Sequence, residues 1–262
     1  MESTCSHRRA LDSKNAFCFN NSNTQNSNNF IGDSTMKKLF AFMAFLFLVL
    51  LGAVAQAANG FLEAYANYRC DAVASRANIL VVHHDADAVV AAVPAHSIVH
   101  EDDGSIYGFA RYYLVVDGRF VEARPIAVYV HETLDLAFIV FAKTPELDGV
   151  TAVVLAPEDS VVENAPSKAI SCTTGSRNPG HIRAVDKNTL TFDFSKEVVY
   201  GESGSGVIDP NGLTIGLLTG FMNDDPSCGI GLRLDPSDVK RAVWAIQRGG
   251  VPRGFVELDM NR

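Results

Sequence analysis

A serine flanked by glycines stands at position 203, in the segment Gly-Glu-Ser-Gly-Ser-Gly-Val of residues 201–207. Glycine adopts backbone angles that other residues avoid, and it lets a substrate approach the main chain closely. The Ser203 hydroxyl becomes a nucleophile only when a neighbouring base accepts its proton. The segment could also form an ordinary surface turn, so a nucleophilic role requires a base and an acid elsewhere in the chain.

Histidine is the side chain that most readily serves as such a base near neutral pH. Beyond residue 57, the histidines that precede the serine are His83, His84, His96, His100, His131 and His181. His96 is the best candidate, because alanine precedes it just after an apolar stretch, in the segment Val-Pro-Ala-His-Ser-Ile-Val. His131 is the main rival, and a partly exposed turn histidine is the alternative reading of His96.

An aspartate could orient that base. Asp135 opens the apolar segment Asp-Leu-Ala-Phe-Ile-Val of residues 135–140. A carboxylate at the mouth of a buried strand is held by a core element, so it can fix the tautomer of an imidazole and stabilise the imidazolium. The same residue could simply cap the strand. His131 precedes Asp135 by only four positions, and the strand that follows would carry the two apart.

The segment around Ser203 resembles the Gly-Asp-Ser-Gly-Gly motif of trypsin-like (chymotrypsin-fold) serine peptidases, and the Gly-Asn-Ser-Gly-Gly form of the bacterial Deg/HtrA-type proteases in that clan. The segments at His96 and Asp135 are similar to those that carry the base and the acid in this family, in the same chain order. The resemblance spans roughly residues 77–248. It implies a serine endopeptidase that works through an acyl-enzyme without a cofactor, with His96, Asp135 and Ser203 as its triad. It also implies that the backbone N–H groups of Gly201 and Ser203 form the oxyanion hole.

The resemblance extends to substrate binding. It implies that residues 213–220 form the strand before the primary specificity pocket, where an extended substrate pairs with an enzyme edge. Thr219 and Gly220 would line this pocket, and Glu197 could stand at its base and favour Lys or Arg substrates. A solvated Glu197 beside Lys196 is the alternative.

The chain departs from the family pattern at three places. Glu202 replaces the usual Asp or Asn, and Ser-Gly-Val at 205–207 replaces the more usual Gly-Pro. The Gly-Ser/Thr-Gly-Phe segment that often precedes the histidine strand is missing. In activated trypsin-like enzymes the residue at the position of Glu202 pairs with a freed N-terminus. The mature N-terminus here is expected to be a polar segment near Ala58, so this activation switch is not expected.

Short apolar runs broken by turns predict the elements that must position these residues. The expected strands are 78–82, 88–93, 112–116, 120–130, 136–141, 189–195, 207–208 and 213–219. Asp117-Gly118 predicts a two-residue hairpin, and residues 61–75 predict a short N-terminal helix. A capping Asp235 followed by Pro236 predicts a closing helix.

This order of elements favours an all-β barrel or sandwich pair. Together with the resemblance, the order of elements predicts two six-stranded antiparallel β-barrels packed together, with a C-terminal α-helix. The expected divisions are an N-terminal segment (58–76), a first barrel with the His and Asp (77–155), a linker (156–167), a second barrel with the Ser (168–234), the helix (235–248) and a tail (249–262). The tail is too short for a peptide-binding module, so none is expected.

The start of the chain predicts export. Residues 1–35 are rich in Asn and Ser and predict disorder, or upstream sequence ahead of a true start at Met36. Residues 36–57 combine a basic start, an apolar run and Ala-Gln-Ala, which indicates a cleaved signal peptide and a secreted or periplasmic protein. The alternative is a membrane anchor formed by residues 39–55.

Charge and cysteines narrow the partners. A net charge of −8 argues against nucleic acid, because phosphate binding needs a basic face. The expected partner is a peptide or unfolded protein, with no membrane contact after signal cleavage and no metal. The sequence does not predict the oligomeric state. Of the exported cysteines Cys70, Cys172 and Cys228, the last two are the expected disulfide pair. A catalytically silent barrel that acts as a secreted binding module is the alternative function.

Overall fold

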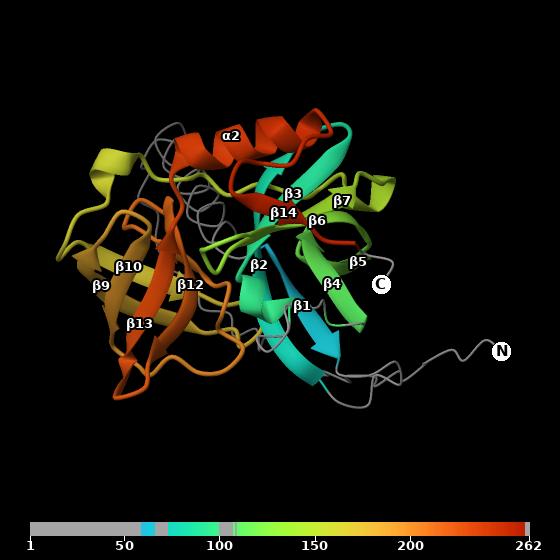
Figure 1. Ribbon diagram of the computed structural model, residues 1–262. Helices are drawn as coiled ribbons and strands as arrows, with labels where there is room; N and C mark the ends of the chain where they lie inside the picture. The colour runs from blue at the N-terminus through green and yellow to red at the C-terminus, as the bar shows by residue number, and fades with distance from the viewer. Residues whose placement is uncertain (1–58, 66–72, 100–106, 108, 260–262) are drawn as a thin grey trace, which may run out of the picture. The chain divides into compact units, whose positions relative to one another are not determined.

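The computed structural model describes residues 59–65, 73–99, 107 and 109–259 (Figure 1). The chain divides into two units, and all of these residues belong to the second, Ala53–Arg262. The signal peptide, the anchor at 39–55, His100 and Cys70 lie outside the described residues. No helix within the described residues is long and apolar enough to cross a membrane.

The first half of this unit and one strand from its C-terminal end form an antiparallel sheet of eight strands, in the order β14-β6-β7-β3-β2-β1-β4-β5. Its strands are β1 (Gly60–Tyr65), β2 (Val73–His84), β3 (Ala88–Val93), β4 (Phe109–Val116), β5 (Arg119–Ala123), β6 (Pro125–His131), β7 (Ala137–Ala142) and β14 (Phe255–Glu257). The expected first barrel of six strands is therefore wrong. The sheet is open because its edge strands β14 and β5 do not pair, and two segments not expected as strands, β1 and β14, enlarge it.

The second half forms a closed antiparallel barrel of six strands, as expected, in the order β10-β13-β12-β11-β8-β9. Its strands are β8 (Pro166–Ile170), β9 (Arg177–Val185), β10 (Thr189–Phe194), β11 (Gly206–Ile208), β12 (Thr214–Met222) and β13 (Asp225–Arg233). The alternation predicted for β10 is confirmed, because Leu190, Phe192 and Phe194 are buried together inside the barrel. Side chains two apart along a strand share one face.

The N-terminal helix expected at 61–75 is wrong for its described part, because Gly60–Tyr65 is a strand. Leu62 and Ala64 share the buried face of β1 and enter the core of the sheet. This period of two matches a strand between β2 and β4, with which β1 pairs on its two sides. Val73, near the end of the predicted helix, begins β2.

One predicted turn is confirmed, and one predicted strand is divided in two. Asp117 and Gly118 have φ values of 48° and 76°, as a tight two-residue hairpin turn between β4 and β5 requires. The single strand expected at 120–130 is instead split into β5 and β6 at Arg124. Pro125 explains the break, since proline lacks an N–H and restricts the residue before it.

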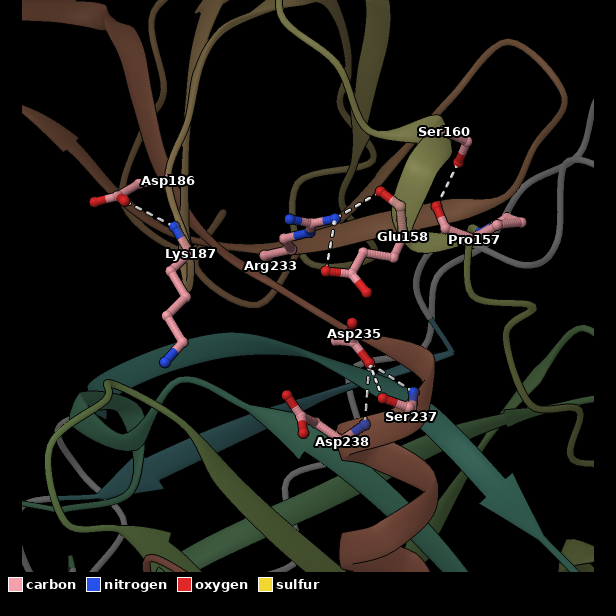
Figure 2. A network of polar contacts seen from close by, with 9 residues as sticks. All are labelled: Pro157, Glu158, Ser160, Asp186, Lys187, Arg233, Asp235, Ser237 and Asp238. Atoms are coloured by element: carbon pink, nitrogen blue, oxygen red, sulfur yellow. Dashed lines mark hydrogen bonds and ion pairs between the residues drawn. The ribbon is translucent and has the colours of Figure 1, made fainter.

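The C-terminal helix is confirmed as α2 (Pro236–Gln247). The Asp235 carboxylate accepts the backbone N–H groups of Ser237 and Asp238, which Figure 2 shows. The buried face of α2 joins one core cluster with Leu80 of the sheet and Leu217 of the barrel. Helix, sheet and barrel therefore share a core, which holds the two strand systems against each other.

The expected disulfide between Cys172 and Cys228 is wrong, since no disulfide joins them. Cys228 is buried in β13, where its sulfur receives a hydrogen bond from Arg183 at 3.5 Å. Cys172 instead follows β8, where its backbone N–H donates to the side chain of Asn78 at 2.6 Å. The two cysteines therefore have separate partners.

Candidate active site

The pairing of β3 with β7 brings the predicted base and acid together. These strands are antiparallel, and Val93 lies opposite Ala137. His96 stands on a short 3-10 turn (Ala95–Ser97) just after β3, and Asp135 stands just before β7. His96 Nδ1 lies 2.7 Å from Asp135 Oδ2, and the His96 backbone N–H donates to Asp135 Oδ1 at 2.9 Å.

The serine reaches this pair from the barrel. Ser203 lies in the loop between β10 and β11, and its Oγ is 3.3 Å from His96 Nε2. The same hydroxyl is 3.3 Å from the Thr219 carbonyl on β12, to which it can also donate. A hydroxyl carries a single hydrogen, so these two acceptors share it. His96, Asp135 and Ser203 thus form a chain of contacts between the sheet and the barrel.

The rival histidines have other partners. His131 Nδ1 accepts the backbone N–H groups of Thr133 and Leu134, both at 3.1 Å, so it closes the turn that precedes Asp135. Burial lowers the pKa of His131 below its usual value. His83 pairs with Asp85 and His181 with Asp193, at 3.1 Å and 3.3 Å, respectively. These contacts leave His96 as the histidine bonded to Ser203.

Glycine is required at two positions of the serine loop. Gly201 and Gly204 have φ values of 88° and 80°, in the left-handed region that other residues avoid. A Cβ on Gly204 would also lie 2.0 Å from the carbonyl oxygen of Asn78 in β2. The turn is closed by the Ser205 N–H, which donates to the Glu202 carbonyl at 3.0 Å. Ser203 therefore sits on a tight turn pressed against the sheet.

The backbone donors expected for an oxyanion hole belong to this turn. Within the part of the chain that the structure describes, the N–H groups of Gly201 and Ser203 donate to no protein acceptor. The adjoining N–H groups of Glu202 and Gly204 do, to Val199 and Leu218, respectively. The two N–H groups that the sequence predicts as oxyanion donors are therefore uncommitted among the described residues.

Glu202 is buried, with 4% of its surface exposed. One carboxylate oxygen accepts the Val199 N–H at 3.2 Å, and the other accepts the Thr174 hydroxyl at 3.4 Å. Among the described residues it forms no ion pair. The Glu202 side chain therefore bonds to its own loop through Val199 and to the loop after β8 through Thr174.

Of the residues expected to bind substrate, Thr219 contacts Ser203 through its carbonyl oxygen. Thr219 donates its hydroxyl to the Ile230 carbonyl at 3.2 Å, and a Cβ placed on Gly220 would meet open space. Glu197 is exposed between β10 and β11, and within the described part it makes no hydrogen bond or ion pair. Sequence reasoning missed Tyr200, which is 94% exposed beside Gly201 and meets the Phe221 ring edge-on.

Sequence reasoning also missed Asn78, which is fully buried in β2 and bonded to the serine loop. An asparagine inside an apolar strand was the available signal, since a buried polar side chain needs partners.

No family model matches the chain, and a search of curated proteins found no relative. Solved structures do resemble it. Deg5 superposes with a TM-score of 0.55 at 16% identity, over 78% of this chain and 96% of that chain. The HtrA-type protease AlgW with a decapeptide gives 0.54 at 16%, over 76% and 68%. The active form of the Rv3671c protease from M. tuberculosis gives 0.50 at 21%, over 71% and 81%.

These neighbours are HtrA/Deg-type trypsin-like serine proteases, so the chain has the fold of a Deg/HtrA-like protease domain.

Proposed function

We propose that this protein is a serine endopeptidase that hydrolyses peptide bonds through an acyl-enzyme intermediate. The observation that carries the proposal is the position of His96 between Asp135 and Ser203, with contacts of 2.7 Å and 3.3 Å. The fold of HtrA-type proteases supports the same class of reaction. No cofactor or metal enters the chemistry.

In the first step, Ser203 Oγ attacks the carbonyl carbon of the scissile bond, and His96 Nε2 takes the hydroxyl proton. Asp135 holds Nδ1–H, so that Nε2 is the nitrogen with a lone pair for that proton, and it stabilises the imidazolium that forms. His96 then gives the proton to the leaving amine, and the acyl group stays on Ser203. A water molecule activated by His96 releases the acid product and restores the serine.

The N–H groups of Gly201 and Ser203 stabilise the negative charge on the carbonyl oxygen during both steps. Thr219 and Gly220 bind the substrate chain next to the scissile bond, where the position of Gly220 leaves open space. Glu197 contributes a charge at the same region. These roles follow the resemblance, and the 3.3 Å contact between Ser203 Oγ and the Thr219 carbonyl supports a binding site beside Thr219.

The substrate is a peptide or an unfolded protein, because an extended chain can pair with the part of β12 beyond Leu218, where the pairing of β12 with β11 has ended. Export through the signal peptide at 36–57 would deliver the enzyme to a secreted or periplasmic location. The acidic balance, with a net charge of −8, argues against a nucleic-acid role.

Hydrolysis of casein by the purified protein tests the proposal. We expect Ser203→Ala to abolish hydrolysis while its circular dichroism spectrum and thermal unfolding stay those of the wild type. Ser195→Ala, on the same loop but exposed, is the matched control and should keep full activity. A well-folded wild-type protein that cleaves no casein or peptide library would favour the silent binding module instead.

A further inference from the structure

Asn78 is a buried polar residue that links the sheet to the serine loop. It lies in β2 with no exposed surface, and its neighbours Ala77 and Ile79 are equally buried. Its side-chain N–H group lies 3.1 Å from the carbonyl oxygens of both Gly201 and Ser203. Its backbone N–H also donates to the Ser203 carbonyl, at 2.7 Å.

The other end of the same side chain holds a second barrel loop. Asn78 Oδ1 accepts the backbone N–H groups of Cys172 and Thr173, at 2.6 Å and 3.1 Å, respectively. The Thr173 hydroxyl in turn donates to the Gly201 carbonyl. Gly201 therefore has its carbonyl oxygen held from two sides, by groups that are themselves bonded to each other.

The chemistry of this position selects asparagine. An amide offers donors at one end and an acceptor at the other, whereas a carboxylate accepts only and an apolar side chain does neither. A buried polar group costs free energy unless it is bonded, so a core position in a strand ordinarily favours an apolar residue. All the partners of the Asn78 side chain named above lie in the two barrel loops.

The bonds fix the peptide groups around the proposed oxyanion hole. A carbonyl oxygen and the following N–H share one rigid plane. Holding the oxygens of Gly201 and Ser203 fixes the planes on either side of the Glu202–Ser203 peptide, which carries the Ser203 N–H. The same bonds fix the peptide plane that follows Gly201. The N–H of Gly201 itself is the second proposed donor.

We propose that Asn78 is a positioning residue, which holds the Gly201 and Ser203 carbonyls against the sheet so that their N–H groups face the substrate oxygen. The inference rests on the proposed peptidase function. Because β2 belongs to the same sheet as β3 and β7, the same bonds set the serine loop against the strands that carry His96 and Asp135.

The test compares Asn78→Asp with Asn59→Asp in the full chain. The first change keeps the shape of the side chain and replaces its donor with an acceptor. Asn59 is the matched control, since it is also buried beside the same sheet and bonds to the backbone of Thr151 and Val81. Thermal unfolding, kcat and KM on a peptide substrate are measured for both variants.

For Asn78→Asp we expect kcat to fall by about 100-fold with little change in KM, the scale of losing one oxyanion donor. The affinity for a peptide boronate, which places an oxygen in the oxyanion hole, should fall with kcat, while affinity for the product peptide should not. Asn59→Asp should lower the unfolding temperature and leave kcat within a few-fold of the wild type.

If Asn78→Asp fails to fold, Thr173→Val carries the test, because it removes the second bond to the Gly201 carbonyl. Its kcat should fall about tenfold at unchanged KM, and an unchanged kcat overturns the inference. If the wild type is active but Asn78→Asp and Asn59→Asp lose kcat equally, this inference alone is overturned. A wild type without activity overturns the proposed function, and the inference with it.

Discussion

Both carboxylate oxygens of Asp135 are bonded to His96, one to the ring and one to the backbone. Oδ2 lies 2.7 Å from Nδ1, and Oδ1 accepts the backbone N–H at 2.9 Å. The two bonds fix the carboxylate relative to the main chain as well as to the imidazole. The ring is thereby held with Nε2 toward Ser203, at 3.3 Å.

Asp135→Asn should lower kcat by about 10⁴-fold without unfolding the protein, because an amide would stabilise the wrong tautomer of His96. Peptide hydrolysis under saturating substrate measures the loss. Asp193→Asn is the matched control, since Asp193 also pairs with a histidine, His181, but on the barrel. A similar loss of kcat in both variants would contradict the orienting role of Asp135.

Gly204→Ala should destabilise the protein far more than Gly118→Ala. Both glycines have positive φ, but the added Cβ meets nothing at Gly118 and lies 2.0 Å from the Asn78 carbonyl at Gly204. The Gly118 change should cost about 1–2 kcal/mol from the left-handed backbone alone. Urea unfolding compares the two, and equal costs would mean that the serine turn does not press against β2.

Asp85→Ala should lower the free energy of unfolding at neutral pH. The backbone N–H groups of Asp87 and Ala88, with His83 and Gln247, hold the pKa of the Asp85 carboxyl well below its usual range. A lowered pKa in the folded state stabilises the protein above the unfolded-state pKa of about 3.9, and this stabilisation is lost as the pH falls toward the folded value.

The difference in unfolding free energy between wild type and Asp85→Ala should therefore narrow as the pH falls below about 4. Chemical denaturation at a series of pH values measures it. A difference that stays constant or grows toward acid pH would contradict the assigned shift.

Glu197→Gln should change the preference for Lys or Arg before the cut only slightly. Glu197 is exposed, and an ion pair in water is worth at most about 1 kcal/mol, or about fivefold in kcat/KM. Matched peptides with Lys or Leu before the cut measure the effect. A loss far beyond fivefold for the Lys peptide alone would show a carboxylate enclosed by the bound substrate.

The sequence predicted the elements whose signals are local. The cap at Asp235 and the Asp117-Gly118 turn depend on neighbours along the chain, and both were confirmed. The all-β class followed from short runs and alternation such as that of β10, and the six-stranded barrel followed only with the resemblance. The strand β1 was missed because apolar residues at 61, 62 and 65 also fit a helix, and only its pairing with β2 and β4 decides the matter.

Some contacts between distant parts of the chain were predictable through the resemblance, and the others were not predictable. The spacing of His96, Asp135 and Ser203 does not itself state that they meet, and their catalytic roles stay predictions. Asn78 escaped notice because its side-chain partners lie more than ninety positions away along the chain. The open sheet was not predicted for a related reason, because the edge strand β14 pairs with β6 from the far end of the chain.

Labelling by a fluorophosphonate probe tests the central claim most directly, because the probe reacts with a serine only when its hydroxyl is activated. We expect peptide mapping of the full chain to place one covalent phosphonyl group on Ser203. Labelling should be absent in Ser203→Ala, and lost in His96→Ala although the serine remains. A well-folded protein that is not labelled, or that is labelled at another serine, would contradict the account.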